Sequence, residues 1–156
     1  MTSSTVGLSL RATIDTVRRA APPLLLVVGL ERPVSQALQS LADDLGVAVL
    51  PLGRLFAEQL ADLTPRDRSR RASRLFQDVL RSFHGPLTII DRTAVLFLPD
   101  LMLNPLQLLA EASRAHGTLI AAWCGAWDGT VLTYARPGHP EYQRYAHPVA
   151  TVVAVA

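Results

Sequence analysis

Hydrophobic positions along the chain form short continuous runs that alternate with helical patterns. The run at residues 24–28 is wholly apolar, which is typical of a central parallel strand covered on both faces. A glycine follows it, and apolar residues then recur every three or four positions as far as Gly46, the pattern of a helix that buries one face. Runs and helical patterns go on alternating to the end of the chain. The sequence therefore predicts an α/β fold with a mostly parallel sheet between helices, in three layers.

The predicted elements fill one domain, residues 1–156, in which a helix at 8–20 is an N-terminal extension and the core begins at residue 24. Thr64 as N-cap and Pro65 at the first helical position mark the start of the longest helix. The apolar segment 95–98 fits either a helix or a strand. The other predicted strands are 47–50, 87–91, 118–123, 131–135 and 149–155, and the other helices are 33–45, 53–60, 65–83 and 105–116, with one helical turn at 141–145.

The helix predicted at 65–83 has one apolar side and one basic side. A solvated helix face and a surface for anions or nucleic acid both explain this pattern. No aromatic residue interleaves the basic positions, which argues against a platform on which single-stranded bases stack. The arginines on this side are Arg66, Arg68, Arg70, Arg71, Arg74 and Arg81.

Composition narrows the cellular setting. The net charge is only +2, yet every one of the 15 basic residues is arginine, either from a coding bias or for a functional reason. No apolar run is long enough to cross a bilayer, and the first residues lack the pattern of a signal peptide, so we expect no membrane partner. The single cysteine, Cys124, suits a reducing cytoplasm. The four histidines lack the spacing of zinc ligands.

Residues 24–38 have the layout of a phosphate-binding loop: a strand, a glycine turn and a helix start. The motif G-x-x-x-x-G-K-[ST] requires glycine, lysine and a hydroxyl residue where this chain has Val34, Ser35 and Gln36. No lysine elsewhere can replace the missing one, although Arg32 would supply a positive charge. The candidate nucleotide contacts are Gly29, Arg32, Pro33, Ser35 and Gln36.

Asp91 ends the apolar run 87–91. The carboxyl ends of parallel strands lie at one edge of a sheet, so we expect Asp91 on the same edge as Gly29. A carboxylate there would hold Mg²⁺ beside a bound phosphate, which is the Walker B role, and ATP with Mg²⁺ is the cofactor pair that such a site would take. An aspartate that only forms a turn is the other interpretation.

The C-terminal half resembles a known family. The run 87–91 with Asn104-Pro105 is similar to the Walker B strand and following segment of the P-loop-containing protein of BREX type 3 phage-defence systems, the BrxF family. The stretch from Tyr134 to Tyr142 is the most specific part of the match. The motif residues are Trp123, Tyr134, Pro137, His139, Pro140, Glu141 and Tyr142.

This resemblance implies a P-loop NTPase-like domain with a RecA/AAA-type core, acting in bacterial defence beside larger partner proteins. Those partners include a methyltransferase, an alkaline-phosphatase-like protein, a helicase and a large ATPase. Three functions remain open. The chain is an accessory binding module without efficient ATP hydrolysis, an ATPase or nucleotide switch that uses Arg32 and Asp91, or a subunit that contacts DNA through the helix at 65–83.

Overall fold

The structure is a computed structural model that describes residues 3–83 and 85–156, with side chains of the first helix described from residue 10 onward. Its centre is a five-stranded sheet in which every neighbouring pair is parallel. The order across the sheet is β2 (Val49–Pro51), β3 (Leu87–Asp91), β4 (Thr118–Trp123), β1 (Leu24–Val28) and β8 (Thr151–Ala154). The predicted α/β fold with a parallel sheet is confirmed.

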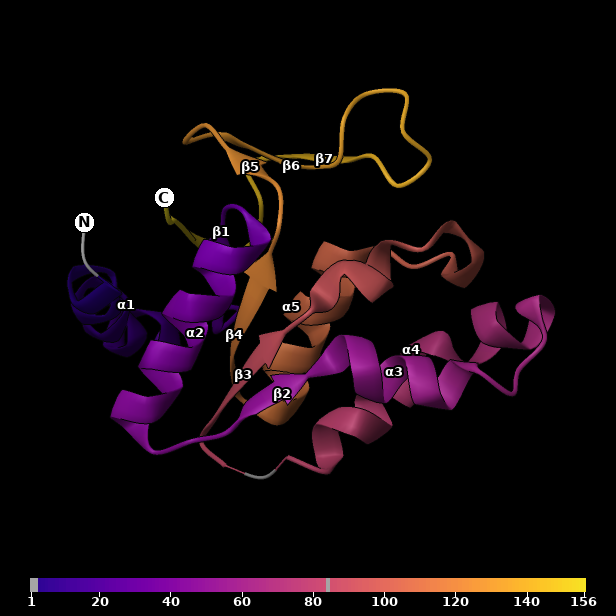
Figure 1. Ribbon diagram of the computed structural model, residues 1–156, viewed down its shortest axis with the longest axis horizontal. Helices are drawn as coiled ribbons and strands as arrows, with labels where there is room; N and C mark the ends of the chain where they lie inside the picture. Colours follow the sequence, from indigo (N-terminus) through magenta and orange to yellow (C-terminus); the bar gives the residue numbers. More distant parts are fainter. Residues whose placement is uncertain (1–2, 84) are drawn as a thin grey trace.

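Helices cover both faces of this sheet (Figure 1). Leu25 and Val27 of β1 pack against α1 (Ser3–Arg18) and α2 (Glu31–Leu45). The alternate residues of β1 face the opposite cluster, which contains α3 (Leu52–Leu60), α4 (Pro65–Arg81) and α5 (Pro105–His116). All five residues of β1 are buried, which explains why this strand lacks polar alternation.

A second, smaller sheet lies beside the carboxyl edge of the first (Figure 1). It consists of β5 (Ala126–Trp127), β6 (Val131–Tyr134) and β7 (Gln143–Ala146), paired antiparallel. The turn between β5 and β6 is held by Asp128, whose Oδ1 accepts the N–H groups of Val131 and Thr130 at 2.6 and 2.8 Å. These bonds stabilise the carboxylate and lower the pKa of Asp128.

Several predicted boundaries need correction. The helical turn expected at 141–145 is wrong, because residues 143–146 extend and pair with β6. The N-terminal helix ends at Arg18, and its residues Leu10, Ile14 and Val17 are buried in one of the two core clusters. The strand expected at 47–50 begins at Val49, and the helix from Pro65 ends at Arg81.

The segment predicted at 95–98 as helix or strand lies mainly in a 3-10 helix, η1 (Thr93–Phe97). A second short 3-10 helix, η2 (Pro99–Leu101), follows it and packs against α4. The last two predicted strands, 131–135 and 149–155, are shorter than expected. Among the described helices, each is too short or too polar to traverse a lipid bilayer.

Candidate functional site

The turn between β1 and α2 is much shorter than a phosphate-binding loop. Only Gly29 and Leu30 separate the end of β1 from Glu31, the first residue of α2. Residues 31–36, which the loop motif would place around a phosphate, therefore form the first turns of the helix, and the Val34 N–H donates to the Leu30 carbonyl at 3.1 Å. Pro33 costs no hydrogen bond, since the first N–H groups of a helix have no intrahelical partner. The predicted strand, glycine turn and helix start are present, but the turn between them is only two residues long.

Gly29 has a structural reason for being glycine. A Cβ at this position would lie 2.6 Å from the backbone oxygen of Val155, and φ is +157°. The Val155 N–H donates to the Val28 carbonyl at 2.8 Å, which holds the C-terminal segment directly over the turn. Gly29 therefore allows two backbone segments to approach closely.

Gly29→Ala is expected to lower the free energy of unfolding by about 1–3 kcal/mol, the usual cost of overpacking. Urea unfolding followed by circular dichroism measures it. The matched background is a chain ending at Ala154, which lacks the Val155 oxygen. There the cost of Gly29→Ala should fall; an equal cost in both backgrounds would show that the clash is not its cause.

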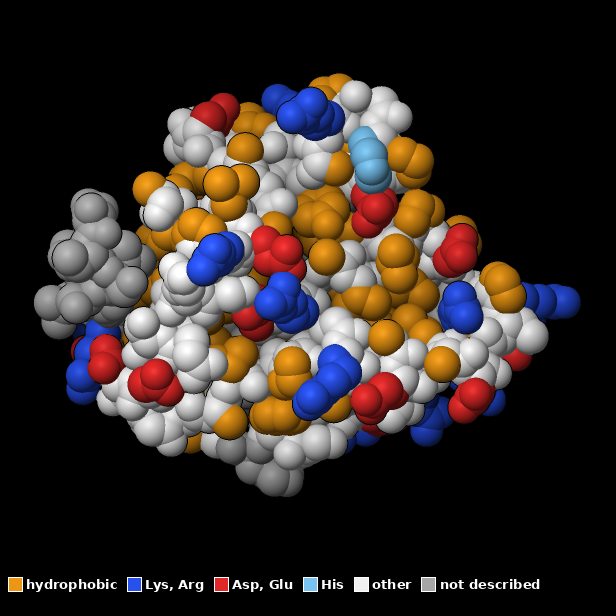
Figure 2. Space-filling view, viewed as in Figure 1, with side chains coloured by type: hydrophobic (Ala, Val, Ile, Leu, Met, Phe, Trp, Pro, Cys, Tyr) orange, Lys and Arg blue, Asp and Glu red, His pale blue; other side chains and the backbone are white. Residues whose placement is uncertain are grey.

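Four of the predicted nucleotide-site residues come together in one pocket of about 560 Å³. Arg32, Ser35 and Gln36 line it from α2, and Asp91 reaches it from the end of β3. Gly29 and Pro33 are outside the lining. The remaining lining residues are Glu31, Gln39 and Arg92. Figure 2 shows acidic and basic side chains next to one another over the start of α2.

The sequence reasoning had missed Gln39 and Arg92 as members of this site. Both have a signal in the pattern of the chain. Gln39 lies four residues after Ser35 and so shares its side of α2. Arg92 directly follows the predicted strand-ending aspartate.

Charges in the pocket balance each other. Glu31 and Arg92 form an ion pair that joins the start of α2 to the end of β3. Asp91 accepts the backbone N–H of Arg92 at 2.7 Å, a contact typical of a turn-forming aspartate. With Arg32 added, two carboxylates face two guanidinium groups, so the lining offers a triphosphate no net attraction.

Both carboxylates of the pocket that could face a magnesium ion are engaged, Glu31 with the Arg92 guanidinium and Asp91 with the Arg92 N–H. The described residues contain no group of three or more His, Cys, Asp or Glu side chains that would hold a metal ion. One hydroxyl in the pocket, Ser35 Oγ, is buried without a hydrogen-bond partner in the described structure. The backbone cradle beside it is small, because Pro33 has no N–H and the Val34 N–H donates to Leu30, which leaves only the first-turn N–H groups of Glu31 and Arg32 without an intrahelical acceptor.

Cys124 follows β4 and is half-buried. Burial, followed by the carboxylates of Glu31 and Asp91, raises the pKa of its thiol from 9.0 to about 11, although Arg92 opposes the rise. Because the thiolate is the nucleophile, this environment makes Cys124 a packing residue rather than a reactive one.

Alkylation of Cys124 by iodoacetamide at pH 8 is expected to be about 100-fold slower in the native protein than in the urea-unfolded chain. A rise of two pKa units reduces the thiolate fraction by that factor below both pKa values. The native rate should keep increasing about tenfold per pH unit up to the raised pKa. Equal native and unfolded rates at pH 8 would contradict the environment described.

Trp123 and Tyr134 of the family motif belong to an aromatic cluster. Trp123 is fully buried, and its ring meets Phe97, Tyr134 and Tyr145 edge-on at centroid distances of 5.0, 6.4 and 5.8 Å. Its Nε1–H donates to the Thr133 carbonyl at 3.0 Å. These contacts attach the small sheet to the large one, so both motif residues have a structural role.

The other motif residues form an exposed turn. Pro137, His139 and Pro140 are exposed, and Glu141 and Tyr142 are half-buried. The His139 ring accepts the Glu141 N–H through Nδ1 at 3.0 Å, and the His139 carbonyl accepts the Tyr142 N–H at 3.0 Å. The histidine therefore shapes its own loop, which Figure 1 shows projecting from the small sheet.

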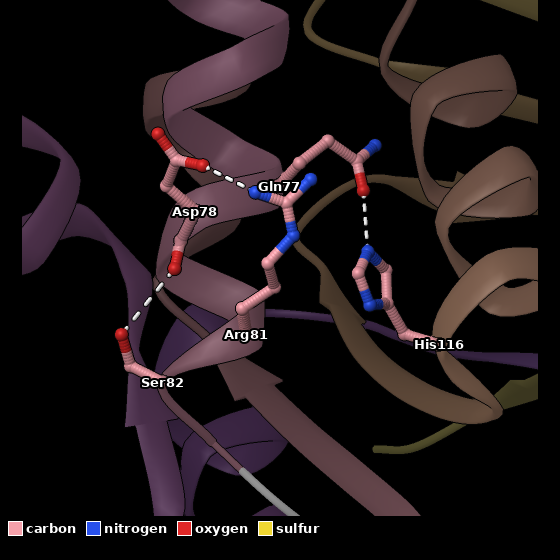
Figure 3. A network of polar contacts seen from close by, with 5 residues as sticks. All are labelled: Gln77, Asp78, Arg81, Ser82 and His116. Carbon is pink, nitrogen blue, oxygen red and sulfur yellow. Dashed lines mark hydrogen bonds and ion pairs between the residues drawn. The ribbon is translucent and has the colours of Figure 1, made fainter.

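The arginines of α4 fall into distinct groups. Arg81 pairs with Asp78 at 2.8 Å, and Arg68 donates to the carbonyls of Leu60 and Leu63. Figure 3 shows the pair with Asp78 and the neighbouring bond between α4 and α5. The remaining members, Arg66, Arg70, Arg71 and Arg74, are exposed.

Comparisons with known proteins give no relative: no family model, curated protein or solved structure matches the chain. The fold and the site therefore define it only as an α/β protein with a polar, charge-balanced pocket at the carboxyl edge of a parallel sheet.

Proposed function

We propose that this protein is an accessory subunit of a bacterial BREX-type phage-defence system, and that it serves there as a binding module without efficient ATP hydrolysis. Two features of the fold support a P-loop origin. Counted in chain order, the parallel strands run 5-1-4-3-2, the order of RecA/AAA-type cores. In addition, Asp91 is the last residue of β3, and it lines the same pocket as the start of α2.

The main support for a non-catalytic role is that α2 already begins at Glu31, two residues after Gly29. Phosphate-binding loops act through the backbone N–H groups of a glycine-rich loop together with those of the first helical turn. Here the equivalent residues already form helix, and the pocket beside them has no net charge. A domain with this geometry would act through the proteins that it contacts.

An ATPase that uses Arg32 in place of lysine is the second candidate. Its support is that Arg32 and Asp91 line one pocket. It requires the first turn of α2 to open so that more backbone N–H groups face the phosphate, and it requires the Glu31 carboxylate to move away from a phosphate held by Arg32. A binding module that does not hydrolyse ATP requires neither change.

Phage plating on cells that carry the native gene cluster tests the proposal. Deleting this gene should abolish protection, and restoring the wild-type gene should recover it. Arg32→Ala and Asp91→Ala should recover it equally well, with protein levels checked by immunoblot. A tagged copy should also co-purify products of the neighbouring genes.

Two outcomes would contradict the proposal in different ways. Unchanged protection after deletion would reject the defence assignment. Loss of protection with both pocket variants, at normal protein levels, would favour the ATPase.

A further inference from the structure

The exposed side of α4 carries four arginines without a carboxylate partner among the described residues: Arg66, Arg70, Arg71 and Arg74. At 3.6 residues per turn they share one side of the helix, within roughly 140° of arc. Two carboxylates lie on the same side of the helix: Asp67, between Arg66 and Arg70, and Asp78, which is paired with Arg81. The arginines outnumber these two carboxylates, so this side of α4 presents a net positive charge to solvent.

Three of these side chains surround a hollow. Arg70, Arg71 and Arg74 line a concavity of about 460 Å³, together with Leu75 and Asp78. The guanidinium group is a planar fork that binds phosphate oxygens in pairs and stays charged at every physiological pH. A hollow lined by three such groups suits an oxyanion.

The helix that presents these arginines is fixed in place. Phe76 and Ala72 are fully buried beneath it. Gln77 Oε1 lies 2.6 Å from His116 Nε2 on α5 (Figure 3), and Arg68 ties α4 to the carboxyl end of α3. Because the backbone is anchored to both neighbouring helices, the four guanidinium groups extend from a rigid platform.

We propose that this face of α4 binds the phosphate backbone of double-stranded nucleic acid, without reading bases. From Arg66 to Arg74 the helix extends about 12 Å. Over that length of duplex axis one strand presents about three to four phosphates, spaced 3.4 Å apart. The number of arginines therefore matches the number of phosphates within reach.

Two alternatives fit this surface less well. Protein partners are held by buried apolar or aromatic anchors, and the large exposed hydrophobic side chains, Leu30, Leu98, Met102 and Val149, all lie outside α4. Single strands are held by stacking on aromatic rings, and the only aromatic side chain within α4, Phe76, is buried. A positively charged surface without anchors is typical of duplex contacts.

Fluorescence anisotropy with a labelled 20-base-pair DNA duplex of arbitrary sequence tests this assignment. If three phosphates are neutralised, log K should fall with log salt at a slope of about −2.7, or about 40-fold between 50 and 200 mM salt. The triple variant R70A/R71A/R74A should lose most of the binding and most of that slope. A second duplex of different sequence should bind equally.

The matched control is R11A/R18A/R19A, which removes the same charge from exposed positions on and directly after α1, on the opposite side of the sheet. It should bind like the wild type. Equal losses in both triple variants would show a general charge effect and overturn the assignment, as would undiminished binding by the α4 variant. Circular dichroism on both variants verifies that each is folded.

An acidic competitor separates nucleic acid from protein partners. Poly-glutamate at the same charge concentration should displace the duplex poorly. Displacement as efficient as that by unlabelled duplex would reassign the surface to acidic protein segments. This proposal uses a different surface from the pocket at Asp91, so its failure would leave the proposed accessory role intact.

Discussion

Trp123→Ala is expected to lower the free energy of unfolding by about 3–5 kcal/mol, the range for removing a large aromatic side chain from a core. The Trp123 side chain is fully buried where the two sheets meet, and it contacts three other aromatic rings. Truncation also leaves the Thr133 carbonyl without its indole donor. Urea unfolding monitored by far-ultraviolet circular dichroism measures the loss.

The matched control is the second tryptophan. Trp127→Ala removes the same side chain from a half-buried position on β5, so its cost should be clearly smaller. Similar losses for the two variants would contradict the central position assigned to Trp123. Trp123→Phe should recover part of the lost stability, because a ring is restored while the hydrogen bond to Thr133 is not.

Gly125→Ala is expected to cost about 3 kcal/mol or more, at the upper end for overpacking. A Cβ on Gly125 would lie 1.9 Å from the Thr133 backbone oxygen and 2.9 Å from Trp123 Nε1. Neither atom belongs to the end of a flexible side chain, so β6 must move away from β4. Near-ultraviolet circular dichroism should therefore lose the signal of the packed aromatic cluster.

Gly138→Ala is the control for Gly125→Ala. Gly138 has φ of +90° with open space around its missing Cβ, so the variant pays only the left-handed strain of about 1 kcal/mol. A cost for Gly125→Ala no greater than this would mean that the small sheet can shift freely, contrary to the packing described.

Strong local signals allowed much of the fold to be predicted. The apolar run 24–28 became β1, and runs 87–91 and 118–123 became β3 and β4 with the expected bounds. Thr64 caps α4 as expected, with its Oγ1 accepting the Asp67 N–H at 3.3 Å. In each case the residues of the element themselves show that it is buried or capped, so no contact with a distant segment is needed to predict it.

The small sheet was harder to predict because its order depends on distant contacts. Residues 143–146 have no strong strand pattern of their own, and β7 forms because it pairs with β6. Tyr145 then turns inward, where its hydroxyl donates to Asn104 at 2.9 Å. Burial raises the pKa of that hydroxyl, in keeping with its packed position. A contact between residues 41 positions apart leaves little trace in the local sequence.

The sequence predicted which residues would meet at the candidate site, but not the length of the turn that shapes it. Arg32, Ser35, Gln36 and Asp91 do share a pocket, as parallel strand ends and one helix start require. The length of the turn could not be read from the residues, because the same glycine suits a long loop or a two-residue connection. The close passage of Val155 over Gly29 decides in favour of the short turn.

Thermal unfolding with and without excess Mg·ATP tests most directly whether this pocket has lost nucleotide binding. The account predicts an unchanged melting temperature, relative to the same ionic strength of buffer. A ligand at 100 times its dissociation constant would add about 2.7 kcal/mol, or roughly 5–11 °C for a chain of this size. A rise of that size that Asp91→Ala abolishes would contradict the account.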